Sequence, residues 1–484
     1  MTDSRPLSKR KTKIIATIGP ASDDLSTLER MIKAGLNVAR LNLSHGNYEE
    51  HARRAKLVRR AAANLGVHVA IMADTRGIEV RTGRLESEMV SLEKGQDFSL
   101  CAESMKGDKH GVSVSYDKLS NILRPGNIVF LDDGGIELIV KHVSGLNIHC
   151  KVVHGGMLGE RRGVNFPGIH LSMSALSPEF LGRLEDELDF AVTERVDYLA
   201  ASFTQSDSEI EDIRAKLRER GAAIPIIAKI ENQAGVNNMQ AIVSLADGIM
   251  VARGDLGVEL PLAQIPTTQK QLIQWSVTNG KPAITATQML ASMVTNPKPT
   301  RAEASDVANA ILDGSSAVML SGETAIGQYP IEAIETMADI ASLTEASLKD
   351  FGVLQTIKMA EVDKTAEALC QAAARLAEQM KAAAIITLTD TGYTARLISR
   401  HRPESIILAA TGSEQVARRL ALNWGVIPLL SKKEINTDDE KSTQYCCQQA
   451  KKLGFLKNGD VVVVTHGTHP GSGGTDLIRV VEID

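Results

Sequence analysis

Lys229 and Glu231 close one of the most apolar stretches of the sequence, IPIIAKIEN at 224–232. The residues before them suit a buried strand, whose surroundings disfavour unpaired charge. Side chains two residues apart on a strand point to the same face, so this ammonium and this carboxylate lie together. We therefore predict a polar site at the carboxyl end of this strand.

Polar residues also follow the other strands that the sequence predicts. Taken singly, each has an ordinary structural interpretation, because an arginine near a strand end forms a salt bridge and a threonine or serine caps the next helix. We assign that interpretation to Arg253 and Glu323. Their gathering at one set of strand ends favours a shared site, since buried charges persist only when paired or bound to ions. The remaining residues are Arg40, Asn42 and Ser44, with His45 on the following loop; Asp74, Thr75 and Arg81; Asp255; Thr287 and Gln288; and Ser321.

The chemistry open to this set involves a divalent cation and an anionic substrate. Glu231 and Asp255 are hard oxygen ligands on adjacent predicted strands, a sparse pair that suits Mg²⁺. Lys229 and Arg40 would form a cationic cradle for a phosphorylated substrate. The set predicts phosphoryl transfer or enolate chemistry, and residue chemistry alone leaves both open. The sequence contains no GxxxxGK[ST] nucleotide-binding motif.

The elements that position these residues alternate between β-branched runs and helix-period segments, as in parallel α/β proteins. In the first helix, SDDLSTLERMIKAG at 22–35, Ser22 or Asp23 would cap the start and Gly35 would end it. Three strands precede residue 76 and five follow residue 165, and eight such units predict a TIM barrel with its chemistry at the carboxyl ends of the strands. We therefore predict an α/β protein with three parts: a TIM (β/α)8 barrel at 1–75 and 166–344, an inserted small β-barrel domain at 76–165, and a doubly wound α/β domain at 345–484.

The composition narrows the choice of partners. The chain has 484 residues, with 54 Lys and Arg against 59 Asp and Glu, a net charge of −5 that favours neither a nucleic acid nor an anionic membrane as partner. Five cysteines without C-x-x-C spacing indicate neither a disulfide framework nor a zinc site. We expect a cytoplasmic protein, because the sequence has no signal-peptide pattern and no run of about 18 apolar residues.

Several strings of the sequence, in this order, resemble the pyruvate kinase family: TKIIATIGPAS, NVARLNLSHG, AKIEN, GIMVARGDLGVE, ITATQML and AVMLSGETAIGQYP. The resemblance covers nearly the whole chain. It implies transfer of the phosphoryl group of phosphoenolpyruvate to ADP, giving pyruvate and ATP in the final step of glycolysis, by a homotetramer. It also implies that the 76–165 insertion is a mobile lid over the barrel rim.

For the reacting groups, the resemblance implies that Lys229 stabilises the transferring phosphoryl group and the enolate, and that Arg40 contacts phosphate. Glu231 and Asp255 would hold Mg²⁺ or Mn²⁺. Thr287 would lie beside the substrate carboxylate, and Thr287 and Ser321 are candidates for the path of the proton that converts enolpyruvate to pyruvate. Phosphoenolpyruvate would also be seated by the backbone of Ala252, Arg253, Gly254 and Asp255.

The resemblance further implies a monovalent cation site formed by Asn42, Ser44, Asp74 and the carbonyl of Thr75. Dependence on K⁺ is associated in this family with an acidic residue shortly after that site, where independent members carry Lys. This chain has Glu79 there. We therefore predict activation by K⁺.

Two further sites are implied for phosphorylated ligands. The nucleotide would be bound by Asn42, His45, Arg81, Asp133 and Arg162, although a plain hairpin turn explains the LDDG string around Asp133 equally well. A phosphorylated allosteric effector would bind between a strand and a helix, at Thr389, Thr391, Gly392 and Thr394, with the loop THPGSGGT at 468–475. An ordinary helix cap without a ligand is the alternative there.

Four places depart from the usual family pattern, and they concern lid closure and nucleotide affinity. Arg76 stands where the family has Lys, Ile78 where it has Pro, Arg161–Arg162 where it has two lysines, and Gln205 where an Arg is common. Arg and Lys are not equivalent in geometry. In the effector region, Asp390 adds negative charge, which favours a sugar or nucleotide monophosphate over fructose 1,6-bisphosphate.

Two other functions fit part of this residue set. A Mg²⁺-dependent barrel lyase or aldolase acting on pyruvate enolate would share Glu231 and Asp255 but would need no nucleotide and no lid. Strict dependence of pyruvate formation on ADP separates it from a kinase. A catalytically silent metabolite-binding scaffold is disfavoured because Lys229, Glu231, Asp255 and Thr287 are all present.

Overall fold

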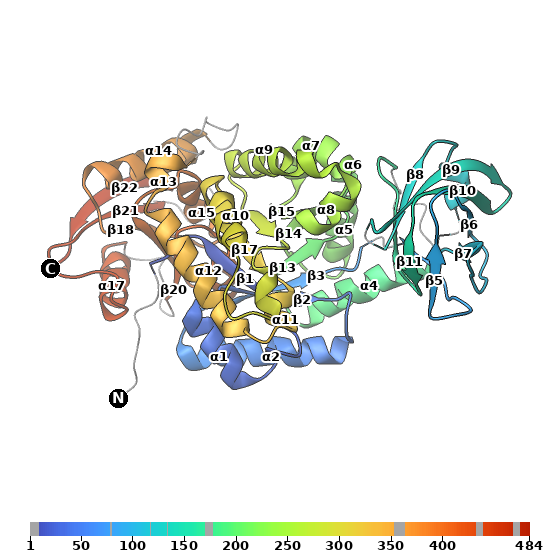
Figure 1. Ribbon diagram of the computed structural model, residues 1–484. Helices are drawn as coiled ribbons and strands as arrows, with labels where there is room; N and C mark the ends of the chain where they lie inside the picture. The colour runs from blue at the N-terminus through green and yellow to red at the C-terminus, as the bar shows by residue number, and fades with distance from the viewer. Residues whose placement is uncertain are drawn as a thin grey trace.

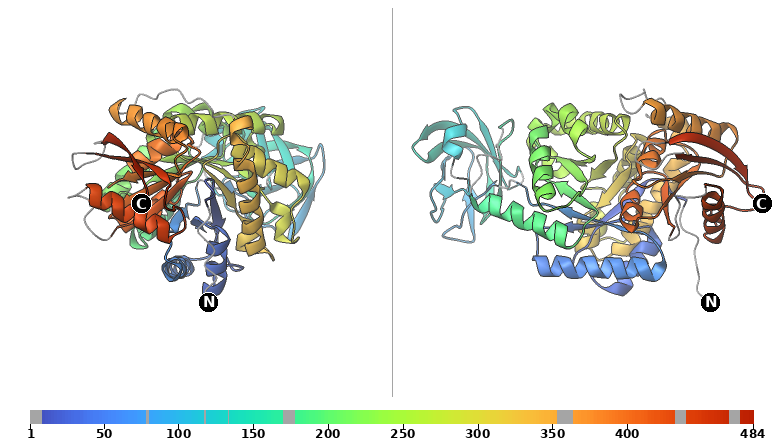
Figure 2. Two further views of the ribbon diagram at one scale, coloured as in Figure 1. Left: turned by 90° about the vertical axis from the view of Figure 1, so that its left-hand side faces the viewer. Right: turned by 180° about the vertical axis from the view of Figure 1, so that it is seen from behind.

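The computed structural model of the chain describes residues 9–77, 80–116, 118–132, 134–169, 178–352, 364–431, 439–467 and 475–484. Ile78, Glu79 and Asp133, which the sequence singled out, lie outside these residues, as does nearly all of the 468–475 loop. The described parts form a central barrel with a β domain at one end and a second α/β domain at the other (Figure 1). The view from behind shows the same row of three parts (Figure 2).

Eight parallel strands close the central barrel, in the order β1-β17-β16-β15-β14-β13-β3-β2. The predicted count of three strands before the insertion and five after it is confirmed. The strands are β1 (Lys13–Thr17), β2 (Val38–Asn42), β3 (Ala70–Asp74), β13 (Tyr198–Ala201), β14 (Ile226–Ile230), β15 (Gly248–Ala252), β16 (Ala283–Ala286) and β17 (Ala317–Leu320).

Alternation along each strand decides which side chains face the barrel interior. On β14, Ile226, Ala228 and Ile230 pack outward into the cluster shared with the helices, whereas Ile227 belongs to the interior cluster. Lys229 has the same parity as Ile227 and therefore leaves the interior at the carboxyl end. The same parity holds elsewhere in the barrel. Interior residues such as Val38, Met72, Ala200 and Met319 precede Arg40, Asp74, Ser202 and Ser321 by two positions.

Helices surround the barrel and begin and end where their capping residues allow. Helix α1 is capped by Asp24, whose side chain accepts from the backbone N–H of Thr27, so neither Ser22 nor Asp23, the two predicted caps, holds that position. The helix ends at Gly35, as predicted. The φ of this residue is +125°, a backbone conformation outside the helical range. The helices of this part are α1 (Leu25–Ala34), α2 (Tyr48–Leu65), α4 (Pro178–Thr193), α5 (Asp207–Glu219), α6 (Gln233–Asn237), α7 (Met239–Leu245), α8 (Arg253–Glu259), α9 (Ile265–Thr278), α10 (Arg301–Leu312), α11 (Gly322–Ala325), α12 (Pro330–Glu345) and α13 (Leu348–Phe351).

The inserted part is a curled β structure. Its main sheet has seven strands in the order β4-β12-β8-β9-β10-β6-β7, and β11 pairs with β5. The two edges of the sheet meet at a bridge between Thr82 and Val114, directly after β4 and β7, which gives it the character of a small barrel. The elements are β4 (Val80–Arg81), β5 (Met89–Leu92), β6 (Asp97–Cys101), β7 (Gly111–Ser113), α3 (Leu119–Ile122), β8 (Ile128–Leu131), β9 (Ile136–Ser144), β10 (Asn147–His154), β11 (Gly156–Gly159) and β12 (Gly163–Asn165).

The C-terminal part has a five-stranded sheet in the order β20-β19-β18-β21-β22. All of its pairs are parallel except β21 with β22, so the last strand is an antiparallel edge. The elements are α14 (Lys364–Gln379), β18 (Ala384–Leu388), α15 (Tyr393–Arg400), β19 (Ile406–Thr411), α16 (Glu414–Leu420), β20 (Val426–Leu430), α17 (Asp439–Lys452), β21 (Val461–Gly467) and β22 (Thr475–Glu482).

This C-terminal part docks on the amino-terminal ends of the barrel strands. Arg418 Nε contacts Asp197 Oδ1 at 2.9 Å, directly before β13, and Lys13 Nζ at the start of β1 donates to the carbonyl of Val426 at 2.7 Å. Ala421 and Leu422 pack with the interior residues of the barrel and close its floor. The opposite end of the barrel, where the strands finish, is left to the inserted part and the polar site. Among the described residues, no helix is long and apolar enough to cross a membrane.

Candidate active site

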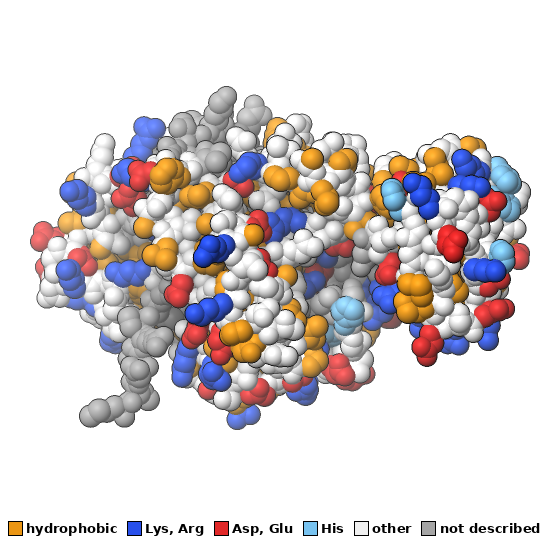
Figure 3. All heavy atoms as spheres, viewed as in Figure 1, with side chains coloured by type: hydrophobic (Ala, Val, Ile, Leu, Met, Phe, Trp, Pro, Cys, Tyr) orange, Lys and Arg blue, Asp and Glu red, His pale blue; other side chains and the backbone are white. Residues whose placement is uncertain are grey.

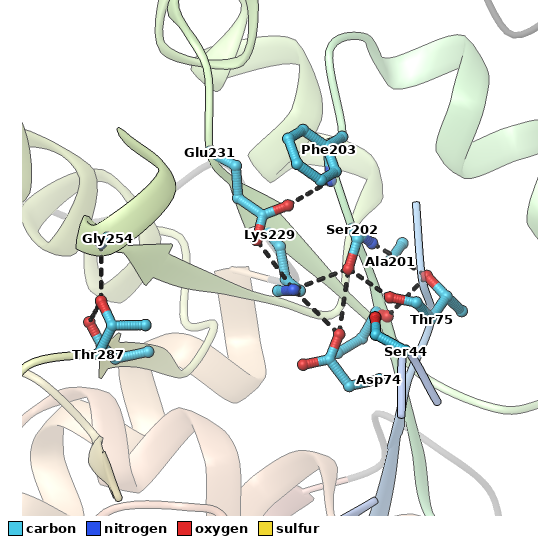
Figure 4. A network of polar contacts seen from close by, with 12 residues as sticks. Ser44, Asp74, Thr75, Ala201, Ser202, Phe203, Lys229, Glu231, Gly254 and Thr287 are labelled. Carbon is cyan, nitrogen blue, oxygen red and sulfur yellow. Dashed lines mark hydrogen bonds and ion pairs between the residues drawn. The ribbon is translucent and has the colours of Figure 1, made fainter. Parts of the chain in front are cut away.

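Lys229 is the centre of a buried polar network at the carboxyl ends of β3, β13 and β14 (Figure 4). Its Nζ lies 2.9 Å from Glu231 Oε1, 3.0 Å from Asp74 Oδ1 and 2.7 Å from Ser202 Oγ. Burial alone would lower the pKa of this ammonium, but the two carboxylates outweigh burial and raise the pKa above its usual value. Lys229 is therefore stabilised as a cation and is fixed by three oxygen contacts.

Asp74 forms ion pairs with Arg40 and Lys229, the two cations that the sequence analysis predicted to bind phosphate. Its Oδ2 accepts from Arg40 Nε at 2.6 Å, and its Oδ1 faces Lys229. The residue is completely buried, which would raise the pKa of its carboxyl group, but Arg40 and Lys229 outweigh this and lower the pKa. Arg40 also donates from Nη1 to Thr17 Oγ1 at 2.9 Å. Both cations are thus held in place by an ionised carboxylate before any substrate binds.

Ser202 is a member of this network that the sequence analysis missed. Its hydroxyl lies 2.7 Å from Lys229 Nζ, 2.6 Å from the carbonyl of Thr75 and 3.1 Å from Asp74 Oδ1. A hydroxyl has one proton, so it can donate to only one of the two acceptors at a time. The available signal was its position, two residues after the interior residue Ala200 at the end of a strand.

Glu231 and Asp255 lie on neighbouring segments, as a pair of metal ligands requires. Strands β14 and β15 pair with Ile230 opposite Val251, which places Glu231 at the level of Ala252. The sequence analysis placed Asp255 on the strand, but this residue lies in the first turn of α8. Glu231 is 1% exposed, and its Oε2 accepts from the backbone N–H of Phe203 at 2.6 Å, which fixes the carboxylate.

The donor set fits a hard divalent cation that keeps its own waters. Within the described part of the chain, no group of three or more His, Cys, Asp or Glu residues forms a metal cage. Mg²⁺ commonly binds through one or two carboxylates together with substrate oxygens, so a two-carboxylate site is chemically adequate.

The four oxygen donors predicted for a monovalent cation come from adjacent segments. Asn42 ends β2 and Asp74 ends β3, and these two residues are paired in register. Ser44 is in the turn after β2, beyond the strand on which the sequence analysis placed it, and lies beside Asp74 and Thr75 (Figure 4). An uncharged hydroxyl, an amide, a carbonyl and one carboxylate form an oxygen set that suits a weakly hydrated cation.

Thr287 is held in a strained conformation at the end of β16. Its φ is +67°, and that of Gln288 is +56°, in a region that β-branched residues rarely adopt. Its Oγ1 accepts from the backbone N–H of Gly254 at 2.7 Å and donates to the carbonyl of Ala286 at 2.7 Å. Such strain costs about 1–3 kcal/mol and gathers at functional sites. The hydroxyl is thereby fixed against the backbone segment predicted to seat the substrate.

Arg253 and Ser321 take different positions around this segment. The Arg253 guanidinium contacts Asp306 Oδ1 at 2.7 Å and the carbonyl of Thr287 at 2.8 Å, and so supports the strained turn. The hydroxyl of Ser321 is buried and has no hydrogen-bond partner. Its backbone N–H donates to Glu323 Oε2 at 2.7 Å, which fixes the residue while leaving the hydroxyl available.

The residues predicted for the nucleotide spread over the barrel and the inserted part. His45 is exposed on the loop after β2, Arg81 donates to the carbonyl of Arg161 at 2.9 Å, and Arg162 lies 3.4 Å from Asp132. The molecular surface is hollowed between the barrel and the inserted part, with acidic and basic side chains at its edge (Figure 3). Among the described residues, these contacts of Arg81 and Arg162 are made within the inserted part.

The inserted part touches the barrel rim through α8. The side chain of Glu259 is hydrogen-bonded to the side chain of Asn165 and to the backbone of Phe166, at the end of β12. Burial raises the pKa of this carboxyl group to about 7, although both hydrogen bonds lower it. The return segment of the insertion is thus anchored to the helix that carries Asp255.

The predicted effector residues form one turn of the C-terminal part. The backbone N–H of Gly392 donates to Thr389 Oγ1 at 2.9 Å, and Thr394 Oγ1 lies 2.6 Å from Thr475 Oγ1. Gly392 has φ +79°, which a left-handed turn before α15 requires. Thr391, exposed beside it, contacts the backbone N–H of Tyr393. The arrangement presents several hydroxyls at the start of a helix.

Comparisons with known proteins agree over the length of the chain. Residues 9–334 match the family described as pyruvate kinase, barrel domain, and residues 367–481 match pyruvate kinase, alpha/beta domain. A pyruvate kinase of Clostridium acetobutylicum is 43% identical over 478 residues, which cover 98% of this chain and all of that protein. A pyruvate kinase of Bacillus licheniformis is 42% identical over 474 residues, 97% of this chain and 80% of that protein. A crystal structure of a pyruvate kinase from Cryptosporidium parvum has a TM-score of 0.93 at 37% identity, covering 99% of this chain and 97% of that one. The chain therefore belongs to the pyruvate kinase family of phosphotransferases.

Proposed function

We propose that this protein transfers the phosphoryl group of phosphoenolpyruvate to ADP, giving pyruvate and ATP. The observation that carries the proposal is the Lys229 network, in which a cation is held by Asp74, Glu231 and Ser202 at the rim of the barrel. Phosphoryl transfer needs positioning and charge stabilisation more than covalent chemistry. A cation fixed in advance supplies both without reorganising during the reaction.

In this proposal Lys229 and Arg40 bind the phosphoryl oxygens and stabilise the enolate charge left on the departing oxygen. Glu231 and Asp255 would hold Mg²⁺ or Mn²⁺, which would supply positive charge against the anionic substrate. Thr287 and the backbone of Ala252 to Asp255 orient the substrate carboxylate. The N–H of Gly254 donates to Thr287 Oγ1 at 2.7 Å, which holds this hydroxyl beside the backbone segment to which we assign the carboxylate.

Protonation of the enolate completes the reaction, and Ser321 and Thr287 are the groups that we assign to the proton path. Both hydroxyls lie at the carboxyl ends of neighbouring strands, β17 and β16. The unpartnered Ser321 hydroxyl can hold a water molecule aimed at the substrate carbon.

We also propose activation by K⁺, bound by Asn42, Ser44, Asp74 and the carbonyl of Thr75. The Ser202 hydroxyl supports this proposal. The shorter of its two contacts with acceptors is with the Thr75 carbonyl. When a cation binds that carbonyl, the hydroxyl can rotate and donate to Asp74 instead. The Ser202 hydroxyl thereby keeps an acceptor for its proton in either state.

The other parts of the proposal concern the whole molecule. The 76–165 insertion closes over the nucleotide and excludes water, which would otherwise accept the phosphoryl group. Thr389, Thr391, Gly392 and Thr394 bind a phosphorylated metabolite that regulates activity. The enzyme acts in the cytoplasm as a homotetramer with barrel residues 1–75 and 166–344 and regulatory residues 345–484.

The decisive experiment measures pyruvate formation with and without ADP and with K⁺ replaced by Na⁺. We expect strict dependence on ADP and loss of most activity without K⁺. Lys229→Met should abolish turnover, because Asp74 and Glu231 then face the substrate phosphate without their shared cation. ADP-independent pyruvate formation would point to a lyase, and full turnover of Lys229→Met would refute the assigned mechanism.

A further inference from the structure

Arg76 occupies the junction between the monovalent cation site and the inserted part. It follows Thr75 and precedes Gly77, whose φ of +72° and close approach to Ser202 and Phe203 leave no room for a side chain. A Cβ at Gly77 would lie 2.6 Å from Ser202 Cβ. The chain therefore leaves the barrel through a tightly seated turn, and Arg76 is the side chain at its start.

The guanidinium of Arg76 fixes one peptide of the loop after β2. Its Nε donates to the carbonyl of Leu43 at 2.6 Å. The N–H of the same peptide, that of Ser44, donates to Asn42 Oδ1 at 3.2 Å. The peptide is thus held at both ends, and the residue that it orients is Ser44, one of the proposed cation ligands.

The same arginine is tied to the helix on which the inserted part returns. Its backbone N–H donates to Glu187 Oε1 at 3.2 Å, and its Nε lies 3.9 Å from that oxygen. Glu187 is on α4 and its side chain is 3% exposed, whereas that of Arg76 is 36% exposed. A cavity of about 30 Å³, lined in part by Thr75, Arg76 and Glu187, has room for a water molecule. Arg76 thus contacts both the loop after β2 and α4.

We propose that Arg76 is a positioning residue that sets the K⁺ affinity of the site by locking the Leu43–Ser44 peptide to the hinge of the inserted part. This inference rests on the proposed K⁺ site. A guanidinium donates in a fixed plane, so it can fix the direction of the peptide carbonyl. The ammonium of a lysine is a flexible point charge and would hold the same carbonyl less rigidly. The departure from the usual Lys noted in the sequence thus has a structural consequence.

The test uses Arg76→Lys, which keeps the charge, and Arg59→Lys as matched control. Arg59 also donates from one nitrogen to a backbone carbonyl, that of Arg195 at 2.8 Å, on the outside of the barrel. For each protein we would measure the rise in the midpoint of thermal unfolding as KCl replaces tetramethylammonium chloride at constant ionic strength. The K⁺ concentration for half-maximal activity would be measured in parallel.

We expect Arg76→Lys to need about tenfold more K⁺ for half of the stabilisation and half of the activation, the effect of weakening one hydrogen bond to a loop that carries a ligand. Its kcat at saturating K⁺ should stay close to that of the parent protein, and Arg59→Lys should not change the K⁺ response. Equal K⁺ responses of Arg76→Lys and the parent protein would overturn this inference alone. A parent protein that responds to K⁺ in neither assay would overturn both the inference and the proposed K⁺ site.

Discussion

Replacing Ser202 by Ala tests whether the network around Lys229 acts as a unit. The hydroxyl accepts from Lys229 Nζ at 2.7 Å and donates toward the Thr75 carbonyl at 2.6 Å or toward Asp74. Removing it deletes one charge-assisted hydrogen bond and leaves a buried carbonyl without its donor. A hydrogen bond to a charged group contributes about 1.5–3 kcal/mol. We expect the free energy of unfolding to fall by about 2 kcal/mol.

The same substitution should also reduce catalysis, by a similar free energy. Lys229 would keep its contacts with Asp74 and Glu231, so it would remain charged, but its ammonium would lose one of three directions that fix its place. If about 1.4–2.8 kcal/mol of transition-state stabilisation depends on that placement, kcat/KM falls about ten- to a hundredfold. The assay couples pyruvate formation to a reporter, alongside urea unfolding of the same samples.

A matched truncation elsewhere separates a catalytic effect from a structural one. Ser399 is buried and donates to the carbonyl of Trp424 at 2.6 Å, a bond of the same length in the C-terminal part. Ser399→Ala should lose a comparable free energy of unfolding and keep its kcat. If Ser202→Ala loses stability to the same extent as Ser399→Ala while its kcat/KM stays within twofold of the parent, the reasoning about the Lys229 network is wrong.

The remaining predictions concern the barrel floor and the anchor of the inserted part. Leu422→Ala should lower the free energy of unfolding by about 2–5 kcal/mol, because its fully buried side chain closes the barrel interior, whereas Leu343→Ala, at a position 76% exposed, should change it little. If Leu422→Ala and Leu343→Ala had equal effects in urea unfolding, the docking of the C-terminal part on the barrel floor would be contradicted. Burial raises the pKa of Glu259 to about 7 from its usual value of 4.5. Between these two pH values the native state retains a proton that the unfolded chain has lost, so the free energy of unfolding falls as pH rises from 4.5 to about 7. Glu259→Gln should remove that decline and gain stability relative to the parent at pH 8 more than at pH 5; a difference independent of pH would show that the carboxyl group does not titrate there.

Much of the architecture could be predicted because it depends on local pattern. Eight β-branched runs and the helices between them predicted the closed barrel. A strand buried on both sides admits few polar residues except at its end. Lys229 and Glu231 stood out for that reason. The same pattern contained Ser202, but a serine at a strand end carries no signal of charge, so its role emerged only when three partners were seen around it.

The sequence by itself determined which residues leave the barrel interior, because alternation along a strand is fixed by covalent geometry. It did not determine that Asp74 holds both Arg40 and Lys229, since those residues are brought together only by closure of the barrel. Nor did it place Asp255 in a helical turn, or tie Arg76 to a peptide 33 residues earlier in the chain. Such contacts depend on distances between strands and loops that no local pattern encodes. The tertiary structure alone decided them, and with them the charge and direction of each group at the site.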